Sequence, residues 1–354
     1  MQEHASSPGS RPASPLLGRL CYRPAGCLCR GATVDAVIWF NVPAARLDSE
    51  DVLKQVRSIG AALTRMGYRT HEIPFSLDVE LLRENLRRLA PEFVVNLVEE
   101  VGEDGSLIHL APAMLETLGV RYTGCPSGPM QQTTDKILAK RKFLDFGIDT
   151  PSWLSRRDSH GFAEGADFII KAVGEDASLG LDEACVVSGR TESELLRLLE
   201  IKNAETGREH FAERFIDGRE FNIGMFGDYE TPQLLPVAEI LFPDNFAKQR
   251  RILDYRAKWD ETSEGYRRIG RTYDFPAGDL PAVSEVQRIA ELCWREFHFK
   301  GYARADFRID AGGRPWLLEI NPNPDIGPES GFMAAVQRAG LDEEDVLDRI
   351  VHLA

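Results

Sequence analysis

Residues 302–321 read YARADFRIDAGGRPWLLEIN, and this stretch is the most informative about the fold of the 354-residue chain. Two runs with strand-like alternation, Tyr302–Asp310 and Pro315–Asn321, flank the pair Gly312-Gly313. A glycine pair between two such runs is typical of a tight β-hairpin. Pro315 cannot donate a hydrogen bond to the ladder, which leaves the register close to the turn open.

Four polar side chains share one face of this predicted hairpin. If the glycines form a two-residue turn, Asp306 lies opposite Glu319 and Arg304 lies opposite Asn321. Residues two positions apart on a strand point to the same side, so all four side chains face the same way. The other face is apolar and is expected in the core; it carries Ala303, Ala305, Phe307, Leu318 and Ile320.

The polar face predicts a metal site beside an arginine. Asp306 and Glu319 repel each other at this spacing unless a cation lies between them. Carboxylate and amide oxygens are ligands that Mg2+ prefers, and the ion completes its shell with phosphate oxygens and water. Arg304 suits the charge that develops on a transferring phosphate or on an oxyanion. A solvated, salt-bridged hairpin is the alternative, but a Glu-x-Asn motif opposite an aspartate is unusual for a mere surface.

The composition is that of an ordinary soluble globular protein. A chain of 354 residues has room for two or three domains. A formal net charge of -14 argues against a nucleic-acid or anionic-membrane partner, because both attract positive charge. No uninterrupted apolar run approaches the ~20 residues that cross a bilayer.

The first 32 residues differ from the rest of the chain in composition and pattern. Residues 1–32 are rich in Ser, Pro, Gly and Arg without periodicity, so we interpret them as a disordered, flexible tail. Three of the six cysteines, Cys21, Cys27 and Cys29, lie in this tail, and the spacing of the six predicts neither a disulfide framework nor a zinc quartet. Metal binding by these three is the alternative to a disordered tail. We therefore expect a reducing compartment and a cytoplasmic location.

Strand and helix patterns alternate after this tail. The segments 36–40, 69–73 and 93–97 are typical of buried strands, and helical spacing lies between them, from about Ser49 to Gly67 and over 79–89. This alternation predicts a parallel α/β unit. Ligands of such sheets gather at the carboxyl ends of the strands, which here precede Glu99, Glu100 and the turn Gly102–Gly105.

The pattern changes from about residue 130. Thr134 is predicted to cap a helix that carries Lys136. A strand is predicted at Phe168–Val173, followed by a loop with glycine and serine at residues 174–180. Thr191 and Glu194 have the spacing of a capping box at the start of another helix.

These motifs together resemble the ATP-grasp superfamily and, within it, the D-alanine–D-alanine ligase family. The resemblance runs from about Val34 to the C-terminus. It implies a fold of the α/β and α+β classes in three parts. These are an N-terminal parallel α/β (pre-ATP-grasp) domain at 33–130, a small central lobe at 131–212, and a C-terminal antiparallel-sheet lobe with the metal site at 213–354.

The resemblance also implies an ATP site. The family's phosphate-binding lysines match Lys136, Lys171 and Lys258, the last in a mobile loop that reaches the γ-phosphate. Ser178 would donate to the phosphates from the loop at 174–180. The segment 213–221 resembles the adenine hinge, in which the residues that contact adenine or ribose are Glu213, Phe215, Ile216 and Glu220. Two exposed glutamates at a turn between strands are the alternative for that segment.

Asp306, Glu319 and Asn321 match the magnesium ligands of the family, with Mn2+ as an alternative ion. Arg304 matches the arginine that stabilises the oxyanion. Two further matches concern the substrates: Glu50 for an ammonium group and Ser330 for a carboxylate.

This chain departs from the family's pattern at three positions. Ala177 and Trp259 stand where the family usually has a serine and a tyrosine joined by a hydrogen bond. Asp325 stands near the place of a glycine that helps to form the oxyanion hole. A carboxylate there opposes an anionic intermediate unless it points away.

The function implied by the resemblance is an ATP-dependent carboxylate–amine ligase that works through an acyl phosphate. Its partners are small-molecule carboxylates and amines, with neither nucleic acid nor membrane, and a homodimer is left open. A ligase for another amino acid or small carboxylate is one alternative to D-alanine specificity. A catalytically silent nucleotide-binding module is the other.

Overall fold

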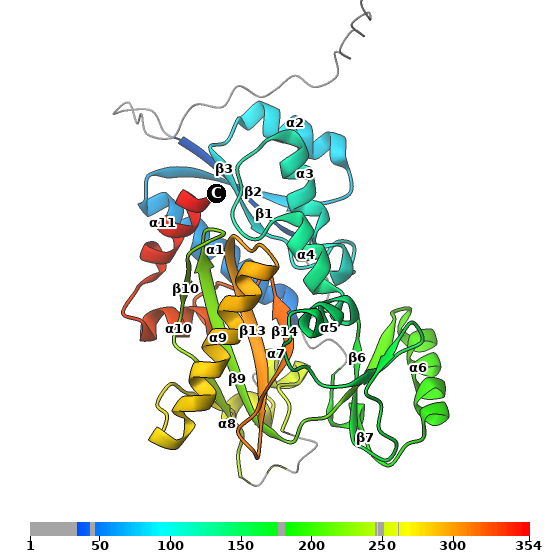
Figure 1. The fold of residues 1–354 in the computed structure, drawn as a ribbon. Helices are drawn as coiled ribbons and strands as arrows, with labels where there is room; N and C mark the ends of the chain where they lie inside the picture. Colours follow the sequence, from blue (N-terminus) through cyan, green and yellow to red (C-terminus); the bar gives the residue numbers. More distant parts are fainter. Residues whose placement is uncertain (1–33, 43–46, 176–180, 245, 247–250, 261) are drawn as a thin grey trace, which may run out of the picture.

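The computed structural model describes residues 34–42, 47–175, 181–244, 246, 251–260 and 262–354, shown in Figure 1. The predicted tail at 1–32, with its three cysteines, lies outside the described residues. Within them, the strands form three sheets. No helix of the described ranges combines the length and the apolar character that a membrane span requires.

The N-terminal part of the chain forms a parallel sheet, as the alternation of strands and helices predicted. Its strands β1 (Val34–Asn41), β2 (Tyr68–Phe75) and β3 (Phe93–Leu97) lie in the order β2-β1-β3. Helices α1 (Leu47–Arg65) and α2 (Val79–Leu89) connect them. The predicted bounds of α2 and β3 are confirmed, whereas α1 begins earlier than predicted.

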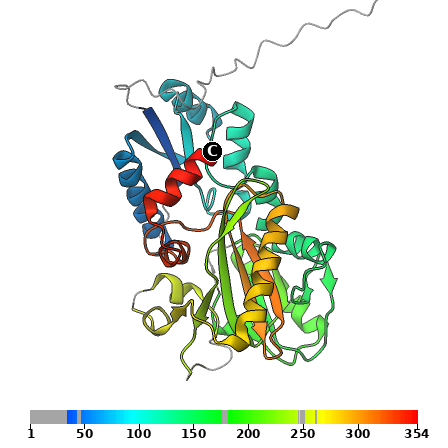
Figure 2. The ribbon, with the colours of Figure 1, turned by 60° about the vertical axis from the view of Figure 1, so that its left-hand side comes forward.

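Both faces of this sheet are covered by helices. On one face, α2 and α3 (Leu110–Leu118) pack against strand residues such as Val37 and Val94. On the other face, α1 packs together with α10 (Gly331–Arg338) and α11 (Glu343–Leu353). Figure 2 shows α11, in red, close to α1, in blue. The end of the chain therefore completes the core of the N-terminal sheet.

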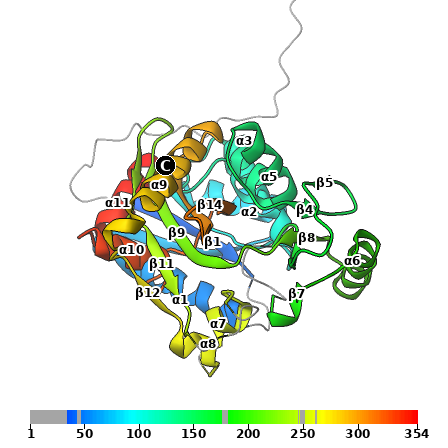
Figure 3. The ribbon, with the colours of Figure 1, turned by 60° about the horizontal axis from the view of Figure 1, so that its bottom comes forward.

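The central part forms a five-stranded antiparallel sheet in the order β5-β4-β8-β6-β7. Helix α6 (Glu192–Thr206) packs on it through Leu195 and Leu199, and the predicted capping box of Thr191 and Glu194 is confirmed. Figure 3 shows α6 at the outer edge of the molecule. The strands are β4 (Trp153–Leu154), β5 (Ser159–His160), β6 (Phe168–Ala172), β7 (Val186–Val187) and β8 (His210–Arg214).

Two consecutive helices, α4 (Ser127–Thr134) and α5 (Lys136–Asp145), precede this sheet. The predicted cap of α5 is wrong by one residue. Thr134 ends α4, where its hydroxyl donates to the Met130 carbonyl. Asp135 is the residue with extended backbone, and its carboxylate accepts hydrogen bonds from the first N–H groups of α5.

The C-terminal part forms an antiparallel sheet in the order β12-β11-β9-β13-β14, with β10 beside β9. Helix α9 (Leu280–Glu296) covers one face, where Val286 and Cys293 are fully buried. Two short helices, α7 (Tyr255–Trp259) and α8 (Glu264–Arg268), lie between β11 and β12 in the chain. The strands are β9 (Gly218–Gly227), β10 (Pro232–Leu234), β11 (Ala238–Leu241), β12 (Gly270–Thr272), β13 (Gly301–Asp310) and β14 (Pro315–Asn321).

The hairpin of β13 and β14 has the predicted pairing at its four polar residues, since Arg304 lies opposite Asn321 and Asp306 opposite Glu319. The predicted two-residue turn is wrong. The N–H of Asp310 donates to the Arg314 carbonyl, so the loop has one residue more, with Gly313 in the left-handed region at φ 80°. The longer loop shifts the register by one, and a β-bulge next to Asp306 shifts it back.

This bulge decides which leucine enters the core. Beyond it, Phe307 lies opposite Leu317 rather than Leu318. Leu317 is fully buried, while Leu318 lines the cavity described below. The predicted core position of Leu318 is therefore wrong. The other four predicted core residues of the hairpin are confirmed: Ala303, Ala305, Phe307 and Ile320.

A buried polar junction joins the hairpin to the N-terminal sheet. The Tyr302 hydroxyl, fully buried, donates to the Asn323 side chain at 3.0 Å and lies 3.3 Å from the Asn96 carbonyl. The Asn323 amide donates to the Val98 carbonyl at 2.9 Å. Directly before Tyr302, Gly301 has φ 88° and packs so tightly that a Cβ atom there would lie 2.6 Å from backbone atoms of Gly124.

We expect Gly301→Ala to lower the free energy of unfolding by ~2–4 kcal/mol, because left-handed strain adds to a backbone clash. Gly313→Ala is the matched control. Its φ of 80° is similar, but a Cβ atom there meets nothing within 4 Å. Gly313→Ala should therefore lose only the cost of left-handed backbone strain, about 1–2 kcal/mol. Chemical denaturation of both variants measures the difference, and equal losses would contradict the close approach at Gly301.

Candidate active site

One cavity of about 960 Å³ is lined by residues from all three sheets. The N-terminal sheet contributes Asn41, at the carboxyl end of β1, and the central sheet contributes Lys171 on β6. Most of the predicted site residues line it: Lys136, Lys171, Glu213, Phe215, Ile216, Glu220, Lys258, Arg304, Asp306, Glu319, Asn321 and Ser330. Ser178 and Ala177 lie outside the described residues. Glu50 and Trp259 are described only as backbone of α1 and α7.

Both carboxylates on the polar face of the hairpin form ion pairs with basic side chains. Arg304 donates to the two oxygens of Asp306, from Nε and Nη2, at 2.8 Å each. The Lys136 ammonium lies 3.0 Å from Glu319. Burial raises the pKa of Glu319, but the ammonium groups of Lys136, Lys171 and Lys258 outweigh it and lower the pKa to about 2. Glu319 is therefore ionised at neutral pH.

The donors of this face fit a hard divalent cation. Two carboxylates and the Asn321 amide, all oxygen donors, lie on neighbouring strands and face one cavity. Within the described part of the chain, no three His, Cys, Asp or Glu side chains converge. The side-chain Oδ1 of Asn321 already accepts a hydrogen bond from the Asn323 backbone N–H at 2.8 Å, and this bond fixes the orientation of the Asn321 amide.

The cavity also holds a lysine cluster. Lys136 begins α5, where its N–H donates to the Val173 carbonyl and its ammonium donates to the Glu175 carbonyl at 2.8 Å. Lys171 lies on strand β6, and its ammonium group is 2.6 Å from the Glu213 carboxylate on the adjacent strand β8. Lys258 lies on α7, and burial lowers its pKa, with Arg304 acting in the same direction. Together these ammonium groups bring positive charge to one part of the cavity, which suits a polyanion.

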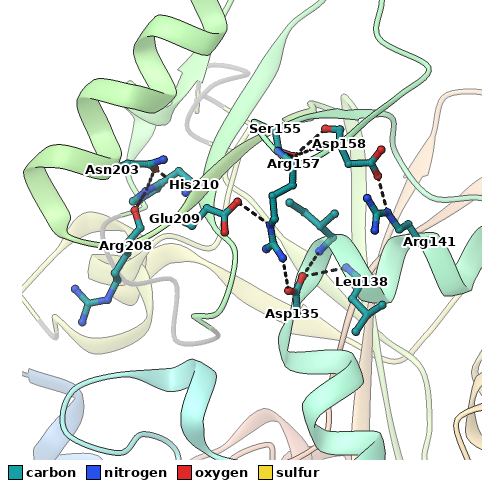
Figure 4. Close-up of polar contacts among 11 residues, drawn as sticks. Asp135, Leu138, Arg141, Ser155, Arg157, Asp158, Asn203, Arg208, Glu209 and His210 are labelled. Atoms are coloured by element: carbon teal, nitrogen blue, oxygen red, sulfur yellow. Dashed lines mark hydrogen bonds and ion pairs between the residues drawn. The ribbon is translucent and has the colours of Figure 1, made fainter.

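A polar network outside the cavity fixes the start of α5, as Figure 4 shows. The Asp135 carboxylate accepts from the N–H groups of Ile137 and Leu138 at 3.0 Å each. Its other oxygen accepts from Arg157 at 2.9 Å, and Arg157 also donates to Glu209 at 2.8 Å. This network ties α5 to the central sheet, so it also holds Lys136 in place.

The predicted adenine hinge lies between β8 and β9. The Phe215 N–H donates to the Asp167 carbonyl at 2.8 Å, so it is already used within the protein. Glu220 lies 2.8 Å from Arg308, a buried arginine on the neighbouring strand β13. The Arg308 guanidinium lies 5.6 Å from the centre of the Phe215 ring. These contacts form a cavity wall in which the Phe215 ring lies beside the ion pair of Glu220 and Arg308.

At the other end of the cavity, Asp51 on α1 and Asp325 in the loop after β14 interact. Burial and the Asp51 carboxyl raise the pKa of Asp325 to about 7. The Gly327 N–H donates to Asp325 at 2.6 Å. Nearby, the Ser330 hydroxyl accepts from the Met333 N–H as the cap of α10, which leaves its own proton to donate.

Comparison with known proteins decides the family. Residues 166–352 match the family model described as "D-ala D-ala ligase C-terminus". The chain is also 31% identical, over 262 residues, to the D-alanine–D-alanine ligase of Cupriavidus necator, and the match covers 72% of each protein. The chain belongs to the D-alanine–D-alanine ligase family. It is thus an ATP-dependent ligase that forms a C–N bond, as the resemblance predicted.

Solved structures confirm the predicted ATP-grasp fold of this family member. The D-alanine–D-alanine ligase of Bacillus anthracis, complexed with ATP, superimposes with a TM-score of 0.65 at 21% identity, covering 91% of this chain and 97% of that one. The VanG D-Ala:D-Ser ligase of Enterococcus faecalis gives a TM-score of 0.66 at 17% identity, covering 91% and 99%.

Two features of the site were missed from the sequence. Lys140, fully buried on α5, lies 2.5 Å from Glu213, on the side opposite to Lys171. Its position one helical turn after Lys136 was the signal that could have found it. Asp51 carried no comparable signal, because its approach to Asp325 joins residues far apart in the chain.

The raised pKa of Asp325 predicts a pH dependence of stability. Its value of about 7 exceeds the ordinary 3.8, so between these pH values the folded state holds a proton that the unfolded state has released. The stabilisation is therefore complete below pH ~4 and lost as the pH rises to 7, by on the order of 3 kcal/mol. Asp325→Asn should remove this slope.

Urea denaturation from pH 4 to pH 8 measures the effect. Asp348→Asn, at an exposed carboxylate on α11, is the control and should keep the wild-type profile. A wild-type slope that survives unchanged in Asp325→Asn would show that other groups cause it.

Proposed function

We propose that the chain uses Mg-ATP to phosphorylate a small carboxylate and then transfers the acyl group to an amine. The observation that supports this best is the shared cavity. Asp306, Glu319 and Asn321 face it together with Arg304, and the lysine cluster lines the same space. A metal site and a polyanion site in one cavity match the needs of a nucleoside triphosphate.

The metal ligands in this proposal are Asp306, Glu319 and Asn321, with Mn2+ as an alternative to Mg2+. When bound, the ion neutralises charge on the β- and γ-phosphates. Arg304 and Lys136 now neutralise the two carboxylates. We infer that both side chains turn to phosphate oxygens when the ion takes their place beside the carboxylates.

The remaining residues position the nucleotide. Lys171 and Lys136 bind phosphate, Lys258 binds the γ-phosphate, and Ser178 donates from the loop after β6. Glu213 accepts from the exocyclic amine of adenine, and Glu220 accepts from the ribose hydroxyls. Because the Phe215 N–H is already bonded to Asp167, we assign the backbone N–H contact with adenine to Ile216 and apolar contact to Phe215.

The chemistry then proceeds by charge stabilisation. The substrate carboxylate attacks the γ-phosphorus, ADP leaves, and the amine displaces phosphate from the acyl carbon. Arg304 stabilises charge on the transferring phosphoryl group and on the later tetrahedral oxyanion. The lysines neutralise the phosphates and keep them in line for the attack.

Two classes of substrate fit the site. The named relatives act on D-alanine, and VanG joins D-Ala to D-Ser. D-alanine accordingly remains one candidate, with Glu50 as the predicted contact of its ammonium group and Ser330 as a donor to its carboxylate. The pair Asp51 and Asp325 favours a second candidate, an amine substrate that brings positive charge and no carboxylate to this end of the cavity.

Three broader predictions accompany this proposal. The division at 33–130, 131–212 and 213–354 describes the three lobes, and a homodimer is left open. A cytoplasmic location agrees with the three described cysteines, Cys125, Cys185 and Cys293, which are buried and form no disulfide.

Removing the metal ligands or the phosphate lysine should stop catalysis. We expect Lys171→Met, and separately Asp306→Asn with Glu319→Gln, to lower Mg2+-dependent ADP formation by at least 100-fold, on the order of 3 kcal/mol of transition-state stabilisation. A coupled ADP assay measures the rate, and circular dichroism checks the fold. Folded variants that keep the wild-type rate would contradict the assigned roles.

A substrate screen should separate the two candidates. Purified protein with Mg-ATP is offered D-amino acids, L-amino acids, dipeptides and diamines, and mass spectrometry detects products that have lost one water. If Asp51 and Asp325 bind a cation, diamines or basic amino acids give the fastest turnover, and Asp325→Asn selectively lowers it. Fastest turnover with D-alanine would reject this second candidate. No ADP with any substrate would support a silent nucleotide-binding module instead.

A further inference from the structure

Two lysines bind one buried carboxylate beside the proposed nucleotide site. Glu213 is only 2% exposed, and its two oxygens lie 2.5 Å from Lys140 and 2.6 Å from Lys171. Burial alone raises the pKa of Glu213, but the two ammonium groups hold it below its ordinary value. The three groups form a buried cluster with one net positive charge.

The two lysines are not equivalent. Lys171 is 17% exposed and lines the cavity, so its ammonium can reach a ligand. Lys140 is 0% exposed and does not line the cavity. Its ammonium group forms an ion pair with Glu213 at 2.5 Å and donates to the Thr150 hydroxyl at 2.7 Å and to the Pro151 carbonyl at 3.4 Å.

This arrangement has a consequence for ligand binding. When Lys171 turns from Glu213 toward phosphate, the carboxylate stays buried and needs another counter-charge. An unpaired buried carboxylate is strongly unfavourable, whereas one that keeps a hydrogen-bonded ammonium group is tolerated. Lys140 already lies in contact with Glu213 and remains there.

We propose that Lys140 is a positioning residue that frees Lys171 for the phosphates of ATP by keeping Glu213 neutralised. The inference rests on the proposed nucleotide site. Lys140 itself does not touch the nucleotide. Without it, Glu213 retains Lys171 as its only strong counter-ion, and phosphate binding weakens while contacts with the nucleoside remain.

The test compares affinities for ATP and adenosine, both with Mg2+, by isothermal titration calorimetry. Only ATP needs Lys171, so the ratio of the two affinities isolates the phosphate contact. In Lys140→Met we expect this ratio to fall at least tenfold. Lys142→Met removes the same charge from the same helix away from Glu213 and should leave the ratio within twofold of wild type.

A second variant keeps the test decisive if Lys140→Met does not fold. Lys140→Met with Glu213→Gln removes the buried carboxylate along with its counter-ion, so Lys171 is free again. In this double variant, the ratio of ATP affinity to adenosine affinity should return to within threefold of the wild-type ratio.

Two results would overturn the inference: an equal loss of ATP and adenosine affinity in Lys140→Met, or a ratio in the double variant as low as in the single one. A wild-type protein that binds no ATP would instead contradict the proposed function.

Discussion

The site depends on opposite charges enclosed in one cavity. Carboxylates at Asp306, Glu319 and Glu213 are largely withdrawn from water, and each is stabilised by an arginine or lysine within 3.0 Å. Burying such charges is unfavourable unless they are paired. In the proposed function, binding of a metal and a triphosphate is therefore an exchange of partners for these carboxylates.

The sequence was sufficient for those parts of the fold in which a periodic pattern determines the geometry. Alternation along the strands predicted that the four polar side chains share one face, whereas the pairing of Asp306 with Glu319 was predicted from a two-residue turn that is wrong. The bulge at Leu318 offsets the extra residue of the loop. Without it, a one-residue slip of β14 would have turned Glu319 and Asn321 to the opposite face of the sheet. The strands and helices of the N-terminal sheet were predictable for the same reason.

Contacts between distant segments were not predictable in this way. The last helix, α11, completes the core of the N-terminal sheet, and Asp51 contacts Asp325 at one end of the cavity. Neither contact leaves a local pattern, since each depends on how complete lobes pack. Lys140 is an intermediate case. Its helical phase could be derived from the sequence, but the carboxylate that it meets comes from a strand about 70 residues later.

The most direct test of the account is the position of the metal. A crystal of the chain with Mn2+ and a non-hydrolysable ATP analogue should show an anomalous peak ~2.2 Å from oxygens of Asp306, Glu319 and Asn321. Arg304 and Lys136 should then contact phosphate instead of the carboxylates. A nucleotide bound in the cavity with the metal elsewhere, or with Arg304 still on Asp306, would contradict the exchange of partners.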